Sequence, residues 1–195
     1  MIRALAVAAG GYLWGAIPTA DLLGRWRGVD LRSSGSRNPG ANNAFRLGGP
    51  WLGGAVLVTE VAKGVIATSL GGAVAGDWGR LLGGLAALAG NVFNPFFRGR
   101  GGKGLGMTSG ITLGAWPLFL PAALAIGAGA FLGFRRSGPA TLVIAAAYVV
   151  GSTAFVLLGW PTGSPLATGP LLIGFATGIG ALLAPRAVAD LQPAP

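Results

Sequence analysis

Apolar residues in this chain form long uninterrupted runs rather than alternating with polar residues. A helix that crosses a membrane needs roughly 20 apolar residues, and fewer where it is short or broken. The pattern therefore predicts an all-α integral membrane protein. The runs extend over Ile2–Leu23, Trp51–Ala75, Gly79–Gly90, Leu105–Phe134, Ala140–Leu158 and Pro165–Ala184.

The run Leu105–Phe134 decides the number of crossings. It contains Pro117 and Pro121, so it is either one long kinked helix or two short helices turning at Trp116-Pro117. Two crossings give about seven transmembrane helices, with the N-terminus outside and the C-terminus cytoplasmic. The cytoplasmic side then carries most of the basic residues, as membrane proteins prefer. These residues are Arg25, Arg27, Arg32, Arg37, Arg46, Arg98, Arg100, Lys103, Arg135, Arg136 and Arg186, against Arg3 and Arg80 outside.

A single crossing would put the basic pair Arg135 and Arg136 outside, so we predict two. The expected organisation is one polytopic domain over residues 1–184 and a short cytoplasmic tail over residues 185–195.

Composition narrows the class of function. The chain is 52% hydrophobic and only 10% charged, with 14 Lys and Arg against 5 Asp and Glu, a net charge of +9. A soluble protein this basic would suggest nucleic-acid binding, but its mean hydropathy is +0.67. Too few polar residues remain to cover a water-facing surface, so we expect a lipid bilayer and no nucleic acid as partner.

The residue types also limit the chemistry. Cysteine and histidine are absent, which excludes disulfides, thiolate sites and the commonest general base. Proton transfer must use a carboxylate, a lysine, water or a group of the substrate. The acidic residues are scattered, so we predict no metal site and no cofactor.

A first polar segment, Gly35–Arg46, is too polar for the bilayer core. Its glycines let backbone N–H groups approach a ligand, its amides and hydroxyl offer hydrogen bonds, and Arg46 can clamp a phosphate. The alternative is a solvated loop with basic anchors. The candidate phosphate-binding residues are Gly35, Ser36, Asn38, Gly40, Asn42, Asn43 and Arg46.

A second polar segment, Gly90–Gly104, ends in Gly101-Gly102-Lys103-Gly104. Its Gly-x-Gly-x-x-Gly spacing lacks the βαβ unit of a dinucleotide site. A glycine-lysine loop that opens a helix is nevertheless a good anion site, because free N–H groups and the helix dipole add to the lysine charge. Further upstream, Glu60 and Lys63 lie on one face of a predicted span and are expected to form an ion pair.

At these residues the chain resembles the bacterial acyl-phosphate:glycerol-3-phosphate acyltransferase family of the PlsY type. The first segment matches the pattern Gly-Ser-Gly-Asn-x-Gly-Ala-Thr-Asn-x-x-Arg except at Arg37 and Asn42. Glu60-Val61-Ala62-Lys63-Gly64 matches an acidic-x-x-Lys-Gly motif, and the second segment is similar to the family's Gly-Gly-Lys-Gly loop. The resemblance covers roughly the first 110 residues in order and spacing.

The resemblance implies a seven-helix fold in the bacterial cytoplasmic (inner) membrane, with the active site facing the cytoplasm. Family members transfer a fatty acyl group from acyl phosphate to glycerol 3-phosphate, giving lysophosphatidic acid and phosphate without an acyl-enzyme. By position, Ser36, Arg46 and Lys103 are the expected catalytic residues. The expected substrate-binding residues are Gly35, Asn38, Gly40, Asn43, Asn91, Gly101, Gly102 and Gly104.

Departures from the family pattern leave two alternatives. Asn91 and Asn94 replace the family's histidine and proline, and only Arg186 and Asp190 remain of a C-terminal motif. One alternative is a non-catalytic relative that binds phospholipid or a phosphorylated metabolite. The other is a small transporter, suggested by glycine-broken helices and ionisable residues within a span.

Overall fold

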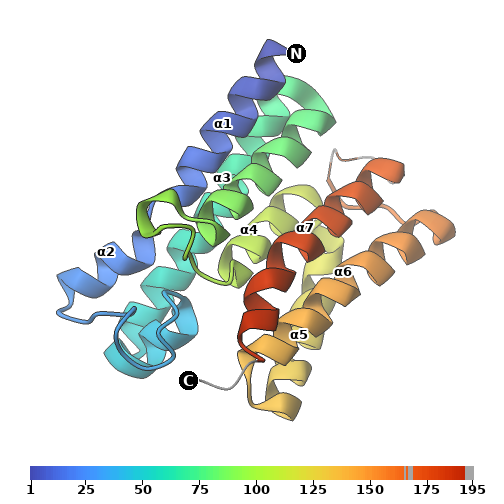
Figure 1. Ribbon diagram of the computed structural model, residues 1–195. Helices are drawn as coiled ribbons and strands as arrows, with labels where there is room; N and C mark the ends of the chain where they lie inside the picture. The colour runs from blue at the N-terminus through green and yellow to red at the C-terminus, as the bar shows by residue number, and fades with distance from the viewer. Residues whose placement is uncertain (165, 167–168, 192–195) are drawn as a thin grey trace.

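The computed structural model describes residues 1–164, 166 and 169–191, and all regular elements in this part of the chain are helical. Figure 1 shows the helices packed as a bundle, with α1 along α3 and α6 along α7. Four helical stretches are long and apolar enough to cross a membrane, namely Ala41–Phe97, Pro117–Phe134, Ser137–Leu158 and Pro170–Ala189.

The first predicted span is divided into two helices. Helix α1 covers Ile2–Ala16 and the shorter α2 covers Thr19–Trp26. Pro18 separates them, because a proline disfavours helical geometry in the residue before it, and Ile17 accordingly has φ −56° and ψ 118°. The prediction of one continuous span over Ile2–Leu23 is therefore wrong, because this segment forms two helices.

Helix α3, Ala41–Val92, bends at two points. Gly49 and Gly76 adopt φ +76° and +62°, which glycine tolerates and other residues rarely adopt. The chain reverses at residues 75–76, and the two arms pack closely: a Cβ on Gly71 would lie 2.2 Å from the Gly79 carbonyl oxygen. The arms, residues 50–74 and 77–92, correspond to the second and third predicted runs.

The next run forms two helices, as predicted. Helix α4, Leu105–Ala115, ends at Trp116, and a 3₁₀ turn, η2 (Pro117–Phe119), leads into α5, Leu120–Phe134. The break lies at the predicted turn because Pro117 removes a backbone donor there.

Helices α6, Ser137–Leu158, and α7, Pro170–Ala189, complete the bundle. The expected start of the last run, Pro165, lies outside the described residues. Helix α7 contains Pro185 and continues beyond residue 184, and the division into a domain over residues 1–184 and a tail over residues 185–195 stays a prediction. Arg186 therefore lies in the last turn of α7, and Asp190 directly follows the helix.

Close packing brings three polar regions together. A Cβ on Gly15 would lie 1.9 Å from the Ala87 oxygen, and one on Gly110 would lie 2.0 Å from the Val61 oxygen, so α1 and α4 press directly on α3. The first loop (residues 27–40), the second loop (residues 93–104) and the end of α7 consequently lie in the same half of the molecule, away from the N-terminus (Figure 1).

Candidate active site

A cavity of about 260 Å³ lies between the first loop, the second loop and the starts of α4 and α6. We call it the central cavity. Most of the predicted substrate-binding residues line it. Its lining contains Ser36, Asn38, Pro39, Gly40, Ala41, Asn42, Asn43, Leu57, Glu60, Asn91, Gly102, Lys103, Gly104, Leu105, Gly106, Ser109 and Ser137.

Asn43 organises the first loop. Its Oδ1 accepts a hydrogen bond from the backbone N–H of Ser36 at 2.9 Å, and its Nδ2 donates to the carbonyls of Leu31 and Ser34 at 2.9 and 3.1 Å. Gly35 is required beside it, because a Cβ there would lie 2.2 Å from Asn43 Oδ1 and the glycine φ is +63°. Gly35 and Asn43 thus position Ser36, which lines the central cavity.

Backbone contacts shape the second loop. A Cβ on Gly101 would lie 1.7 Å from the Asn91 carbonyl oxygen, so only glycine fits there. Gly104, at φ +81°, is the N-cap of α4. Gly104, Leu105 and Gly106 line the central cavity, which brings the unpaired N–H groups and positive dipole end of α4 to its wall. The prediction that the glycine-lysine loop opens a helix is confirmed.

Lys103 is buried and makes two polar contacts. Its Nζ forms an ion pair with Asp190 Oδ2 at the end of α7 and donates a hydrogen bond to Ser137 Oγ at the start of α6. Sequence reasoning missed Ser137, because nothing in the local sequence indicates that α6 begins beside the second loop. The Asp190 side chain is 39% exposed, so water reaches this ion pair.

A wider basic basin of about 710 Å³ adjoins the central cavity and shares Ser36, Asn38, Pro39 and Lys103 with it. The basin also contains Gly101. Its basic lining residues are Arg32, Arg37, Arg98, Arg100 and Arg186, besides Lys103.

The Arg32 side chain connects the first loop to α2 and to the second loop. Its Nε and Nη2 donate to the two carboxylate oxygens of Asp21, each at 2.8 Å, and its guanidinium lies 3.5 Å from the centre of the Phe97 ring. At the start of the same loop, the backbone N–H of Arg32 hydrogen-bonds Asp30 and lowers the pKa of that carboxyl below its usual value. Arg37 has φ +54°, a backbone conformation that glycine adopts readily, and the family pattern has glycine at this position.

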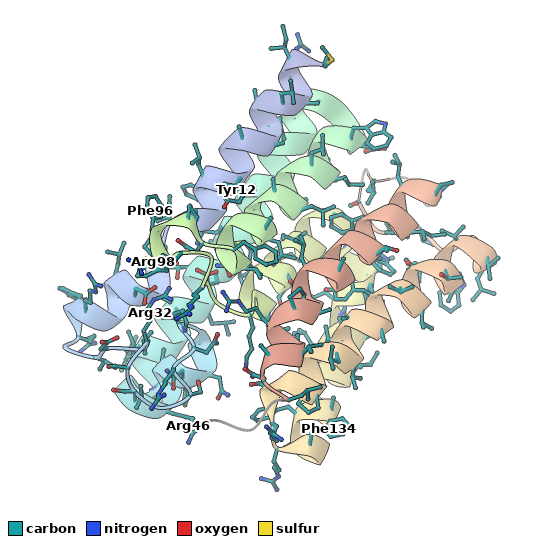
Figure 2. All side chains as sticks on the ribbon, viewed as in Figure 1. Tyr12, Arg32, Arg46, Phe96, Arg98 and Phe134 are labelled. Carbon is teal, nitrogen blue, oxygen red and sulfur yellow. The ribbon has the colours of Figure 1, made fainter. Side chains whose placement is uncertain are left out.

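Arg46 lies outside both spaces. It is exposed on the first turns of α3, and Figure 2 shows it at the margin of the molecule, apart from Arg32 and Arg98. The catalytic role of Arg46 stays a prediction. Arg37, which the sequence reasoning did not select, lines the basin instead.

Glu60 lies at the wall of the central cavity and connects α2 with both arms of α3. Its Oε1 accepts from Thr19 Oγ1 at 2.6 Å and from Lys63 Nζ at 3.2 Å, and its Oε2 accepts from Asn91 Nδ2 at 2.5 Å. Lys63 also donates to the carbonyls of Gly15 and Ile17. The expected ion pair is therefore present, and it fixes Asn91 at the base of the second loop.

An apolar groove of about 420 Å³ continues from the other side of the central cavity. The two spaces share Asn42, Leu105, Ser109 and Ser137. Its remaining lining residues, from α4, α5 and α6, are Thr108, Ala123, Leu124, Gly127, Ala128, Phe131, Ala140, Ile144 and Tyr148. A basic basin, a polar cavity and an apolar groove thus follow one another, which suits a ligand with an anionic head and a hydrocarbon chain.

Residues 5–189 match the sequence profile of the glycerol-3-phosphate acyltransferase family. The chain belongs to this family. A glycerol-3-phosphate acyltransferase of Synechococcus sp. (strain JA-3-3Ab) is 35% identical over 188 residues, which cover 95% of this chain and 87% of that one. The resemblance inferred from the polar segments is confirmed.

Other members of the glycerol-3-phosphate acyltransferase family match over a shorter length. The protein of Symbiobacterium thermophilum is 38% identical over 128 residues, 66% of this chain and 64% of its own. One of Dehalococcoides mccartyi is 39% identical over 144 residues, 72% of this chain and 61% of its own. The match thus spans a little under two thirds of the length of these two relatives.

The fold agrees with the family. The crystal structure of PlsY, an integral membrane glycerol 3-phosphate acyltransferase, in its glycerol 3-phosphate form superposes with a TM-score of 0.79 and 27% identity over 96% of this chain and 90% of that one. The lysophosphatidic acid form gives a TM-score of 0.77, with 26% identity over 96% and 89% of the two chains. The prediction of an all-helical integral membrane protein is confirmed.

Proposed function

We propose that this protein transfers a fatty acyl group from acyl phosphate to the 1-hydroxyl of glycerol 3-phosphate, giving lysophosphatidic acid and inorganic phosphate. The continuity of basic basin, central cavity and apolar groove carries the proposal, because each part suits one part of the substrates. Family membership supports it, as do the glycerol 3-phosphate and lysophosphatidic acid forms of PlsY.

The donor phosphate fits the central cavity. Lys103 supplies a cation, the first turn of α4 supplies backbone N–H groups, and Ser36 supplies a hydroxyl at the same wall. These donors match the oxygens of a phosphate group. The phosphate of glycerol 3-phosphate fits the adjoining basin, where arginines gather. A catalytic role for Arg46 rests on the family pattern alone, because Arg46 lies outside the basin.

The acyl carbon then lies where the central cavity meets the groove, near Ser109 and Ser137. The 1-hydroxyl oxygen of the acceptor bonds to this carbon, the bond from the carbon to the phosphate oxygen breaks, and the hydroxyl proton leaves with the phosphate. Because the donor is already activated, the residues need only align the substrates and balance negative charge. This suits a chain without histidine or cysteine.

We further propose seven membrane crossings: α1, the two arms of α3, α4, α5, α6 and α7. With the N-terminus outside, both loops and the end of α7 face the cytoplasm, and Arg80 faces the other side. This sidedness follows from the distribution of arginine and lysine. A bacterial cytoplasmic membrane, with the cavities open to cytoplasmic glycerol 3-phosphate, is the setting that fits the substrates.

Acyl transfer by the purified protein in detergent tests the proposal. Palmitoyl phosphate and glycerol 3-phosphate are supplied, and lysophosphatidic acid and phosphate are both quantified. We expect both products, with a strong loss in Lys103→Ala. Arg46→Ala tests the role that the family pattern gives to Arg46, and Arg25→Ala is its matched control, because Arg25 is also an exposed arginine outside the cavities. Neither product from a folded sample would refute the proposal and favour the non-catalytic relative.

A further inference from the structure

The apolar groove ends at a rigid aromatic wall. Tyr148, on α6, is 1% exposed and lines the deep end of the groove. Its ring packs edge-on against Phe119, with centroids 5.3 Å apart, and Phe119 stacks on Trp116 at 4.0 Å. The Tyr148 hydroxyl also hydrogen-bonds the hydroxyl of Thr112 on α4.

The wall has no room to retreat. A Cβ on Gly151 would lie 2.5 Å from Phe119 Cε2, so Phe119 already fills the space that a side chain on α6 would occupy. Phe119 is 4% exposed and Trp116 is fully buried. Moving Tyr148 outward would require the whole aromatic cluster to repack, and closely packed interiors resist such shifts.

The side of the groove formed by α5 is built from small residues. Ala123 lies buried at the deep end, with Gly127 and Ala128 closer to the mouth. On the outer edge, Leu124 and Phe131 are 55% and 39% exposed, which leaves the groove open towards the surrounding lipid. A chain in the groove is therefore confined at its end by Tyr148 and along its length by α4, α5 and α6, and the groove is open to lipid only past Leu124 and Phe131.

The depth of the groove can be compared with an acyl chain. From Ser137 at the mouth to Tyr148 at the wall, α6 rises about 16 Å at about 1.5 Å per residue. An extended hydrocarbon chain with C–C bonds of about 1.5 Å advances about 1.3 Å per carbon, so roughly 12 to 14 carbons span that distance.

We propose that Tyr148 and Ala123 set the length of acyl chain that the groove encloses. The inference rests on the proposed function, in which the groove receives the donor's acyl chain. Chains that stop short of Tyr148 leave part of the groove unfilled and lose packing contacts. Longer chains must turn out past Leu124 and Phe131 into the bilayer, so kcat/KM is expected to be greatest for chains that just reach the wall.

A series of saturated acyl phosphates, varied in steps of two carbons, tests this inference by measuring kcat/KM for each donor with the full-length protein in detergent. Ala123→Leu fills the deep end and should move the preferred donor at least one step shorter, with a roughly tenfold loss for the donor preferred by the wild type. Ala128→Leu, which narrows the groove nearer its mouth, should move the preference further. Ala122→Leu is the matched control, because Ala122 is exposed on the same helix.

Tyr148→Ala removes the ring at the end of the groove and should move the preferred donor to longer chains, the opposite direction to the groove-filling variants. An unchanged chain-length profile in both groove-filling variants, each folded and active, would overturn the inference while leaving the acyltransferase proposal intact. A wild-type protein inactive with every donor would refute the proposed function, and the length inference with it.

Discussion

Asp190 forms an ion pair with Lys103, the cation that the proposed mechanism needs to bind phosphate. Lys103 Nζ contacts Asp190 Oδ2 at the end of α7, so an incoming phosphate must bind beside a carboxylate or displace it. Replacing Asp190 by Asn keeps the size of the side chain and removes its charge. We expect this substitution to lower the KM for acyl phosphate and to change kcat little.

The size of the effect follows from the exposure of the pair. Two unit charges about 4 Å apart attract by about 4 kcal/mol at an effective dielectric constant of 20. The Asp190 side chain is 39% exposed, and exposed pairs retain up to about 1 kcal/mol after solvent screening. A free energy of about 1 kcal/mol corresponds to a roughly fivefold lower KM.

Initial rates over a range of acyl phosphate concentrations measure the effect, at low and at high salt. The difference between variant and wild type should shrink in high salt, because mobile ions screen the carboxylate. Asp77→Asn is the control: it makes the same change in net charge at the far end of the α3 hairpin. A KM that is unchanged or raised in Asp190→Asn would refute competition and show that Asp190 holds Lys103 in position.

Three further variants test other parts of the site. Ser36→Ala should lower turnover if its hydroxyl contacts the reacting groups, and a wild-type rate would leave Ser36 a loop residue. Gly101→Ala should abolish activity, because its Cβ would lie 1.7 Å from a backbone carbonyl oxygen; Gly129→Ala, where nothing lies within 4 Å, should retain it. Glu60→Ala should destabilise the fold by about 3 kcal/mol, because the buried Lys63 loses its only carboxylate partner among the described residues; unfolding in detergent measures this, and a wild-type midpoint would contradict it.

The membrane class and the polar chemistry could be predicted from sequence because both are local properties. Repeated apolar runs of about 20 residues indicate helices that cross a membrane, and the break at Trp116-Pro117 follows from a residue that cannot donate a backbone hydrogen bond. The two polar segments likewise identify phosphate chemistry through their residue types. The sequence also indicated the Glu60–Lys63 pair, since residues three apart share a helix face.

Tertiary structure decided which of these residues meet. Ser137 and Asp190 reach Lys103 only because α6 starts, and α7 ends, beside the second loop. Arg46 fits the family pattern yet lies outside both cavities, whereas Arg37 lines the basin. The groove that ends at Tyr148 is formed by three helices. No local sequence pattern predicts these contacts, because they depend on how glycine-rich helix faces pack across long sequence separations.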